Sequence, residues 1–139
     1  MNIDRAWLAT HLPHQGAMSL LDEIVAWNAT AIRAVARNAC DPAHPLRRAG
    51  ELPITCGIEY GAQAAAAHGA LASKNPSGAG LLASVRSVVF HARRLDDVGV
   101  LEITAEQMGG GAAGVLYRFE VSSRERKLVE GRVMVAFAP

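Results

Sequence analysis

One carboxylate stands out because the residues around it are almost uncharged. Glu59 lies near the start of an alanine-rich segment and Gln63 follows four residues later, so both fall on one face of a helix. Burial moves the pKa of a carboxyl group toward neutrality, where it can transfer protons. Glu59 could instead only complement the helix dipole, although a buried carboxylate is costly without a role. Gln63 could orient Glu59 or a substrate, or be a polar group satisfied at an interface.

An imidazole is the natural partner for such a carboxyl group, and the chain has five histidines. His68 is nine residues past Glu59, about half a turn out of phase on a helix, so we expect a packing or interface role for it. His14 and His44 lie in proline-containing loops. The remaining two have no supporting context: His11 and His91.

Other kinds of site find little support. Cys56 could have a depressed thiol pKa near a helix start, but no signature of a cysteine nucleophile accompanies it, and a small buried residue is the better interpretation. Histidines and carboxylates show no metal-ligand spacing such as HExxH, so we expect no metal. The run GGGAAG at 109–114 lacks the helix and lysine of a phosphate loop and is expected to form a flexible hairpin.

The composition is that of a globular protein, with 139 residues, 50% hydrophobic and 19% charged. Fourteen basic side chains against thirteen acidic ones argue against a protein held on nucleic acid by phosphate contacts. Two arginine pairs, Arg47-Arg48 and Arg93-Arg94, are either solvated loop charge or a docking patch for an acidic carrier protein. Two unpaired cysteines, no signal-like start and no apolar span predict a reduced cytoplasmic protein without a membrane helix.

The hydrophobic pattern predicts two helices and six strands. Asp4 can cap a short helix that runs through His11. The long helix enters at Pro53, with Thr55 as a cap, and ends by Ser73. Strands are expected at 20–27, 29–37, 81–92, 100–106, 115–121 and 129–137, with later turns at 95–99, 107–114 and 122–127.

The long helix has an unusual shortage of side-chain bulk. Residues 61–73 include seven alanines, two glycines and one leucine. Such a helix suits a sheet that curls closely around it, because small side chains let neighbouring elements approach on several sides. With no internal repeat or linker, we expect one α+β domain over residues 1–139. An open sheet keeps an exposed edge, which predicts a homodimer or a higher homo-oligomer.

Two stretches resemble the β-hydroxyacyl-[acyl carrier protein] dehydratases. The run LPHQGAMSLLDEIVAW at 12–27 resembles the family's entry segment, L-P-H-R-x-P-F-L-L-V-D. The run LPITCGIEYGAQ at 52–63 resembles the start of the family's central helix, P-G-x-x-x-x-E-A-M-A-Q. Its GIEY.AQ form is similar to the divergent branch found in aryl-polyene-type gene clusters. The resemblance implies a hot-dog fold, in which a curved antiparallel sheet of about six strands wraps one long helix.

The chain departs from the family pattern at two positions. The family's catalytic histidine stands fourteen residues before the helix glutamate, where this chain has Pro45, with His44 one residue away. The family's glycine that offers its N–H to the thioester oxygen is Ile54 here. The resemblance therefore implies Glu59 with His14 as the catalytic residues, with His44 as the alternative histidine. The implied substrate-binding residues are Gln63, Gly57 and Ile54.

The resemblance implies dehydration of a 3-hydroxyacyl thioester to the trans-2-enoyl thioester, in fatty-acid or polyene-type lipid biosynthesis. No cofactor beyond the phosphopantetheine arm of an acyl carrier protein or CoA would be needed. The partner subunit would be a second copy or a related dehydratase. Two alternatives stay open: an acyl-thioester hydrolase of the same fold, and a catalytically silent accessory subunit of a dehydratase, which the missing histidine and glycine favour.

Overall fold

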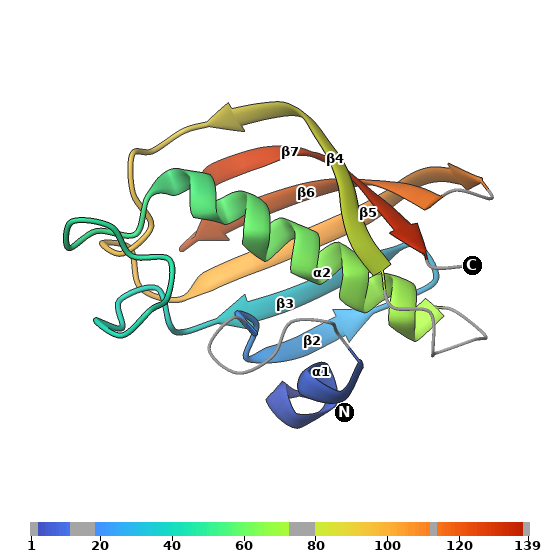
Figure 1. Ribbon diagram of the computed structural model, residues 1–139, viewed down its shortest axis with the longest axis horizontal. Helices are drawn as coiled ribbons and strands as arrows, with labels where there is room; N and C mark the ends of the chain where they lie inside the picture. The colour runs from blue at the N-terminus through green and yellow to red at the C-terminus, as the bar shows by residue number, and fades with distance from the viewer. Residues whose placement is uncertain (1–2, 12–18, 73–79, 112–113, 138–139) are drawn as a thin grey trace.

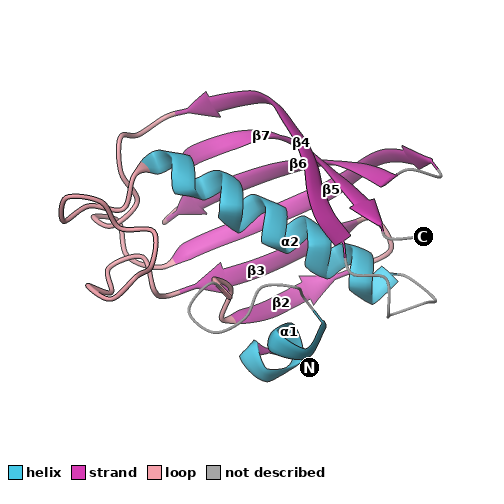
Figure 2. Ribbon diagram, in the orientation of Figure 1, coloured by secondary structure: helices cyan, strands magenta, loops and turns pink. Residues whose placement is uncertain are grey.

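The computed structural model describes residues 3–11, 19–72, 80–111 and 114–137. A long helix, α2 (Gly57–Ala72), lies across the concave face of one curved antiparallel sheet (Figure 1 and Figure 2). The strand order is β1-β2-β3-β5-β6-β7-β4. This confirms the predicted hot-dog architecture. The sheet has seven strands, one more than predicted, because the two-residue strand β1 (Ile3–Asp4) pairs with β2. A strand of two residues is too short to produce an alternating hydrophobic pattern in the sequence.

The six longer strands follow the predicted order. Their bounds are β2 (Glu23–Trp27), β3 (Ala31–Ala36), β4 (Gly80–Phe90), β5 (Leu101–Gly111), β6 (Gly114–Ser123) and β7 (Arg126–Phe137). Alternate residues of β3, β5, β6 and β7 are buried beneath α2, as expected for strands with one face on the core. Figure 1 shows β2 and β3 on one side of α2 and β4 on the other, so the sheet wraps the helix.

The two helix starts show one correct prediction and one wrong one. The short helix α1 (Arg5–His11) begins after Asp4, whose carboxylate accepts the N–H of Trp7 at 3.1 Å, as predicted for a cap. A 3-10 turn, η2 (Ile54–Cys56), precedes α2. The predicted Thr55 cap is wrong because this turn starts directly after Pro53. Thr55 thus lies inside the turn, and no side chain caps it.

Two glycines bring α2 into close contact with the sheet. A Cβ added to Gly57 would lie 2.3 Å from Cγ1 of Val129, and one added to Gly61 would lie 2.3 Å from Cδ2 of Phe119. Both distances are far below ordinary van der Waals contact. The scarcity of side-chain bulk in the helix is therefore a packing requirement, since β6 and β7 occupy the space that larger residues would need.

In two hairpins the strands are longer, and the connecting turns shorter, than the sequence pattern predicted. The predicted turn at 107–114 is wrong, because β5 continues to Gly111, β6 begins at Gly114, and Gly109 and Gly110 pair with Leu116 and Val115. Glycine has a low strand propensity, but the long backbone pairing of β5 with β6 outweighs this preference. At the β6–β7 hairpin, Arg124 and Glu125 have φ values of 51° and 67°, the left-handed region that favours glycine. Across the described residues, no helix has both the length and the apolar character to cross a membrane.

Candidate active site

Glu59 lies in the first turn of α2 and is partly buried. The negative charge of its carboxylate acts on the thiol of Cys56, which lies one turn earlier in the chain. Burial and then the nearby Glu59 carboxylate raise the pKa of Cys56 above its usual value. A thiol held in its protonated form is a poor nucleophile, so the interpretation of Cys56 as a small packing residue is the better one. Glu59 is left as the acidic group at the start of the central helix.

Gln63, one turn after Glu59, is fully buried. Its side-chain oxygen accepts the backbone N–H of Leu20 at 2.9 Å. Leu20 precedes β2 and is itself fully buried. The bond therefore ties the face of α2 that carries Glu59 and Gln63 to the chain segment that leads into β2. The hydrogen bond agrees with the interpretation of Gln63 as a polar group whose oxygen is satisfied within the protein.

The neighbouring Asp22, part of the motif at 12–27, has a structural role in the same region. Its carboxylate pairs with Arg5 of α1 at 2.6 Å and accepts the backbone N–H of Arg37 at 2.5 Å. Asp22 thereby joins α1, the lead into β2 and the end of β3. The motif's acidic residue thus fixes the described end of the motif, at the lead into β2.

His44 belongs to a buried chain of hydrogen bonds. Its Nδ1 accepts the backbone N–H of Leu46 at 3.1 Å, so in the neutral ring Nε2 carries the proton and donates to the Tyr60 hydroxyl at 3.0 Å. The Tyr60 hydroxyl in turn donates to Oδ1 of Asn38 at 2.7 Å. The Asn38 amide completes the chain by donating to the carbonyl of Leu20 at 3.1 Å. We call this chain, from His44 through Tyr60 and Asn38 to the Leu20 carbonyl, the Tyr60 network.

The Tyr60 network favours a neutral His44. Burial and then the charge of Arg47 lower the pKa of His44, although Asp41 opposes this. Both ring nitrogens already have protein partners, and Tyr60 lies between the imidazole and Asn38. His44 is therefore arranged to hold the 38–46 loop on α2. The sequence did not single out Tyr60 or Asn38, and no local pattern marks them, because 22 positions separate the two residues.

His68 has the packing role that its helical phase predicted. It is fully buried, and its Nε2 donates to the carbonyl of Asn28 at 2.9 Å, which leaves Nδ1 to accept the Tyr117 hydroxyl at 2.8 Å. Burial raises the pKa of Tyr117 to about 12, so this hydroxyl stays protonated. The three residues pin the second half of α2 to the β2–β3 turn and to β6.

The backbone at the start of α2 is already hydrogen-bonded at the two positions expected to contact substrate. The N–H of Ile54 donates to the carbonyl of Arg93 at 3.1 Å. The N–H of Gly57 donates to the carbonyls of the 3-10 turn, and the Cα of Gly57 faces Val129. In this arrangement the Ile54 amide joins the helix start to the β4–β5 connection, and the Gly57 amide closes η2.

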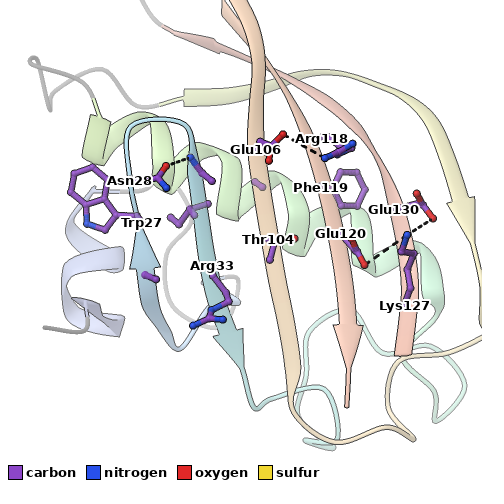
Figure 3. A pocket seen from close by; sticks show the side chains of 14 residues that line it. Trp27, Asn28, Arg33, Thr104, Glu106, Arg118, Phe119, Glu120, Lys127 and Glu130 are labelled. Atoms are coloured by element: carbon purple, nitrogen blue, oxygen red, sulfur yellow. Dashed lines mark hydrogen bonds and ion pairs between the residues drawn. The ribbon is translucent and has the colours of Figure 1, made fainter. Parts of the chain in front are cut away.

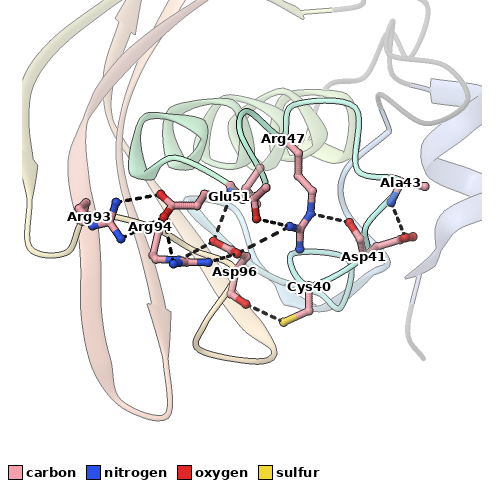
Figure 4. A network of polar contacts seen from close by, with 10 residues as sticks. Cys40, Asp41, Ala43, Arg47, Glu51, Arg93, Arg94 and Asp96 are labelled. Atoms are coloured by element: carbon pink, nitrogen blue, oxygen red, sulfur yellow. Dashed lines mark hydrogen bonds and ion pairs between the residues drawn. The ribbon is translucent and has the colours of Figure 1, made fainter.

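A charged cluster fixes the same helix start from outside (Figure 4). We call it the carboxylate clamp; its members are Glu51, Asp96, Arg47, Arg93 and Arg94. Arg94 donates to Asp96 at 2.6 and 3.0 Å, and Asp96 also accepts the backbone N–H of Leu52 at 3.0 Å. Arg93 binds both oxygens of Glu51, at 2.8 and 3.1 Å. The clamp therefore joins the 47–53 loop to residues 93–96.

The carboxylate clamp changes the interpretation of the two arginine pairs. Arg93 and Arg94 are paired with Glu51 and Asp96, and Arg47 approaches Asp96 at 3.7 Å and donates to the carbonyl of Gly50. Only Arg48 of the four has no side-chain ion pair among the described residues. Charges neutralised within the chain make a weak docking patch, so this region is better described as structural. The hydrogen bond from Arg94, the largest influence, holds the pKa of Asp96 well below its usual value.

A hollow of about 680 Å³ lies on the other face of the sheet (Figure 3). It is lined by residues of β2, β3, β5, β6 and β7, and α2 lies behind the strands. Its charged groups are largely paired, with Arg118 at 3.4 Å from Glu106 and Lys127 at 3.4 Å from Glu130. Because α2, the helix that contains Glu59, lies on the opposite side of the sheet, the hollow is separate from the candidate acid–base site. His14 lies outside the described residues. Within the described residues, no three histidine, cysteine or acidic side chains are grouped to hold a metal ion.

Solved structures confirm the fold. The chain is similar to a chain of the dehydratase heterocomplex ApeI:P from Xenorhabdus doucetiae, with 22% identity, a TM-score of 0.80, and coverage of 95% of this chain and 91% of that one. It also resembles a mutant of the thioesterase PA1618 from Pseudomonas aeruginosa, with 14% identity, a TM-score of 0.71, and coverage of 98% and 94%. The thioesterase HI1161 from Haemophilus influenzae matches with 13% identity, a TM-score of 0.65, and coverage of 94% and 81%.

No curated protein sequence matches the chain. The family is shown by a different comparison, which agrees with the resemblance of the two motifs. The model of the ApeP-like family, described as ApeP dehydratase, matches residues 7–139, which include the Tyr60 network, the carboxylate clamp and Glu59. The chain therefore belongs to the ApeP-like dehydratase family.

Proposed function

We propose that the chain dehydrates a 3-hydroxyacyl thioester to the trans-2-enoyl thioester, with Glu59 as one of its two acid–base groups. The observation that carries this proposal is the helix start GIEYGAQ, within a family match that covers residues 7–139. There Glu59 is the acidic residue of the first turn of an otherwise nearly uncharged helix. Gln63 on the same face is bonded to the segment that precedes β2.

The reaction needs two proton transfers at neighbouring carbons. A base removes the proton from C2, which is acidic because it adjoins the thioester carbonyl, and its electron pair forms the C2–C3 double bond. The C3 hydroxyl leaves with a proton supplied by an acid, as water. A donor near the carbonyl stabilises the developing enolate oxygen. We propose that Glu59 and a histidine share the acid and base roles.

We propose His14 as that histidine, before His44. His44 has both ring nitrogens engaged, by Leu46 and Tyr60, and a lowered pKa, so recruiting it requires breaking the Tyr60 network. His14 is six residues before Leu20, a length of chain that extends at most about 20 Å. Since Gln63 anchors Leu20 one turn from Glu59, this chain length is compatible with contact between His14 and Glu59.

The substrate would be carried on the phosphopantetheine arm of an acyl carrier protein or CoA, and we propose no metal or other cofactor. The apolar acyl chain also needs an enclosure. Strand β4 forms one end of the sheet and leaves Val85, Val89 and Phe90 at 38%, 48% and 43% exposure. An edge strand with exposed apolar residues favours pairing with another subunit. We therefore propose a dimer through β4, with a second copy or a related dehydratase.

The proposal is tested with a purified 3-hydroxyacyl thioester, by following the enoyl product. Glu59→Gln should lower kcat/KM by about a hundredfold or more, the usual contribution of a general acid or base. Glu102→Gln, which changes an exposed carboxylate on β5, is the matched control and should have little effect. His14→Gln should resemble Glu59→Gln, whereas His44→Gln should mainly reduce stability. Full activity of Glu59→Gln would contradict the proposed site.

Two alternatives have observations in their favour. The likeness to two thioesterases keeps an acyl-thioester hydrolase open, and release of free thiol from a saturated acyl thioester would support it. The similar chain from Xenorhabdus doucetiae belongs to a heterocomplex, and this chain has Pro45 at the family's histidine position, so an accessory subunit also stays open. Turnover that arises only when an active dehydratase of the family is added would support that alternative over ours.

A further inference from the structure

Three arginines stand in one row across the end of the sheet. Arg86 of β4 pairs in register with Arg132 of β7, and Arg132 pairs in register with Arg118 of β6. Directly opposed residues in antiparallel strands project from the same face. The neighbour Val133 is buried under α2, so this arginine row (Arg86, Arg132 and Arg118) projects from the outer face, where all three residues are exposed. Like charges directly opposite one another destabilise a sheet.

The arginine row is only partly neutralised by the chain itself. Arg118 has Glu106 at 3.4 Å. Glu130, two positions from Arg132 on the same face of β7, is taken by His91 at 2.7 Å and Lys127 at 3.4 Å. Among the described residues, Arg86 and Arg132 have no ion-pair partner. The uncompensated positive charge is therefore greatest at β4, the edge of the sheet.

A second copy of the chain cannot supply the missing carboxylate at that edge. The sequence of β4, GLLASVRSVVF, contains Arg86 as its single charged residue. If two copies of β4 overlap fully about a two-fold axis, Val85 lies on the axis, and Arg86 faces Ser84 of the second copy. The two Arg86 side chains are then diagonal neighbours on one face, at about 7–8 Å. The second arginine row continues the first and adds to its repulsion.

We infer that β4 selects a related subunit with a carboxylate on its edge strand, in preference to a second copy of this chain. This inference rests on the proposed pairing through β4. Strands in a sheet lie about 4.8 Å apart, so an acidic outward residue on the adjoining strand comes within ion-pair reach of Arg86. The exposed Val85, Val89 and Phe90 give the edge its general affinity. Arg86 then decides which partner strand is accepted, because one arrangement is attractive and the other repulsive.

The chain can supply its own probe for this selection. Arg86→Glu places a carboxylate on an otherwise identical edge strand. Mass-tagged wild-type chain and Arg86→Glu are mixed in equal amounts at low salt, and the dimers are counted by native mass spectrometry. We expect the mixed dimer to exceed its binomial share, with a dissociation constant on the order of tenfold below that of the wild-type dimer. The excess should shrink as added salt screens the charges.

The controls separate this inference from the proposed pairing. Arg33→Glu carries the same change on the outer face of β3, which lies four strands away from the edge strand β4. This variant should mix with wild type at the binomial share. Binomial mixing of Arg86→Glu at every salt concentration would overturn the charge selection and leave the β4 dimer standing. An equal excess for Arg33→Glu would also overturn it. The absence of any dimer, in every mixture, would overturn the pairing itself.

Discussion

The contact between Gly61 and Phe119 gives a direct test of how α2 meets the sheet. A methyl group at position 61 would lie 2.3, 2.5 and 3.0 Å from Cδ2, Cγ and Cβ of Phe119, where carbon atoms normally stay about 3.5–4.0 Å apart. The ring cannot retreat easily, because Gly131 faces its other side, with Cε1 3.1 Å from the Cβ that Gly131 lacks. Overpacking of this kind costs about 1–3 kcal/mol, against a gain of about 1 kcal/mol in helix propensity.

Because the added methyl group would meet three atoms of the ring at 3.0 Å or less, we expect an overpacking cost in the upper part of this range, about 2–3 kcal/mol. After subtraction of the gain in helix propensity, Gly61→Ala should lower the free energy of unfolding by about 1–2 kcal/mol. Gly57→Ala should cost less, because only Cγ1 of Val129 comes close, at 2.3 Å, while its Cβ stays at 3.4 Å. Urea unfolding followed by circular dichroism measures both, provided that the m-value is unchanged. Gly109→Ala, which meets nothing within 4 Å, is the control. If Gly61→Ala is as stable as wild type, the described helix–sheet contact is incorrect.

Three further predictions concern the loops around the site. Asp96→Asn should cost about 1 kcal/mol at neutral pH. The folded pKa of Asp96 is depressed, so the stability that its carboxylate contributes is present above the unfolded pKa of about 3.9 and is lost as pH falls through the lower folded pKa. The free energy of unfolding of Asp96→Asn should therefore fall less steeply with decreasing pH than that of wild type. Equal pH profiles for the two proteins would argue against this role. Arg124→Asn with Glu125→Gly should raise Tm by about 4 °C, since both residues have positive φ; an unchanged Tm would contradict strain there. Tyr60→Phe should cost about 1–3 kcal/mol in urea unfolding, because two buried partners lose their hydroxyl group; a neutral effect would mean that water replaces it.

Most of the fold could be predicted because it follows from local alternation. Strands β3, β5, β6 and β7 each bury alternate residues beneath α2, and this period of two is written directly in the sequence. The failures occur where a long-range pairing overrides a local preference. Glycines at 109–111 signal a turn, yet they extend β5 because β6 pairs with them in register. Thr55 resembles a cap, yet the helical turn already begins at Ile54, whose N–H is held by the carbonyl of Arg93.

The candidate site was less predictable, because its members are distant in sequence. The sequence identifies Glu59 and Gln63 through their spacing on one helix, and it shows that His68 is out of phase with them. The hydrogen bond between Tyr60 and Asn38 joins α2 to a loop that has no regular pattern. Whether an arginine pair is solvated or neutralised depends equally on distant carboxylates, as Glu51 and Asp96 show for Arg93 and Arg94. Such pairings become visible only once the sheet brings the loops together.

Strand β4 connects the proposed chemistry to the proposed assembly. Val85 and Phe90 pair in register with Val133 and Val129, which are buried beneath α2, so the exposed side chains of both β4 residues lie on the helix side of the sheet. A strand added to β4 would cover this apolar surface alongside the helix that carries Glu59. A desolvated site is what makes a carboxyl group useful for proton transfer, and an acyl chain needs the same apolar cover. The edge that selects the partner would then also complete the enclosure in which Glu59 acts.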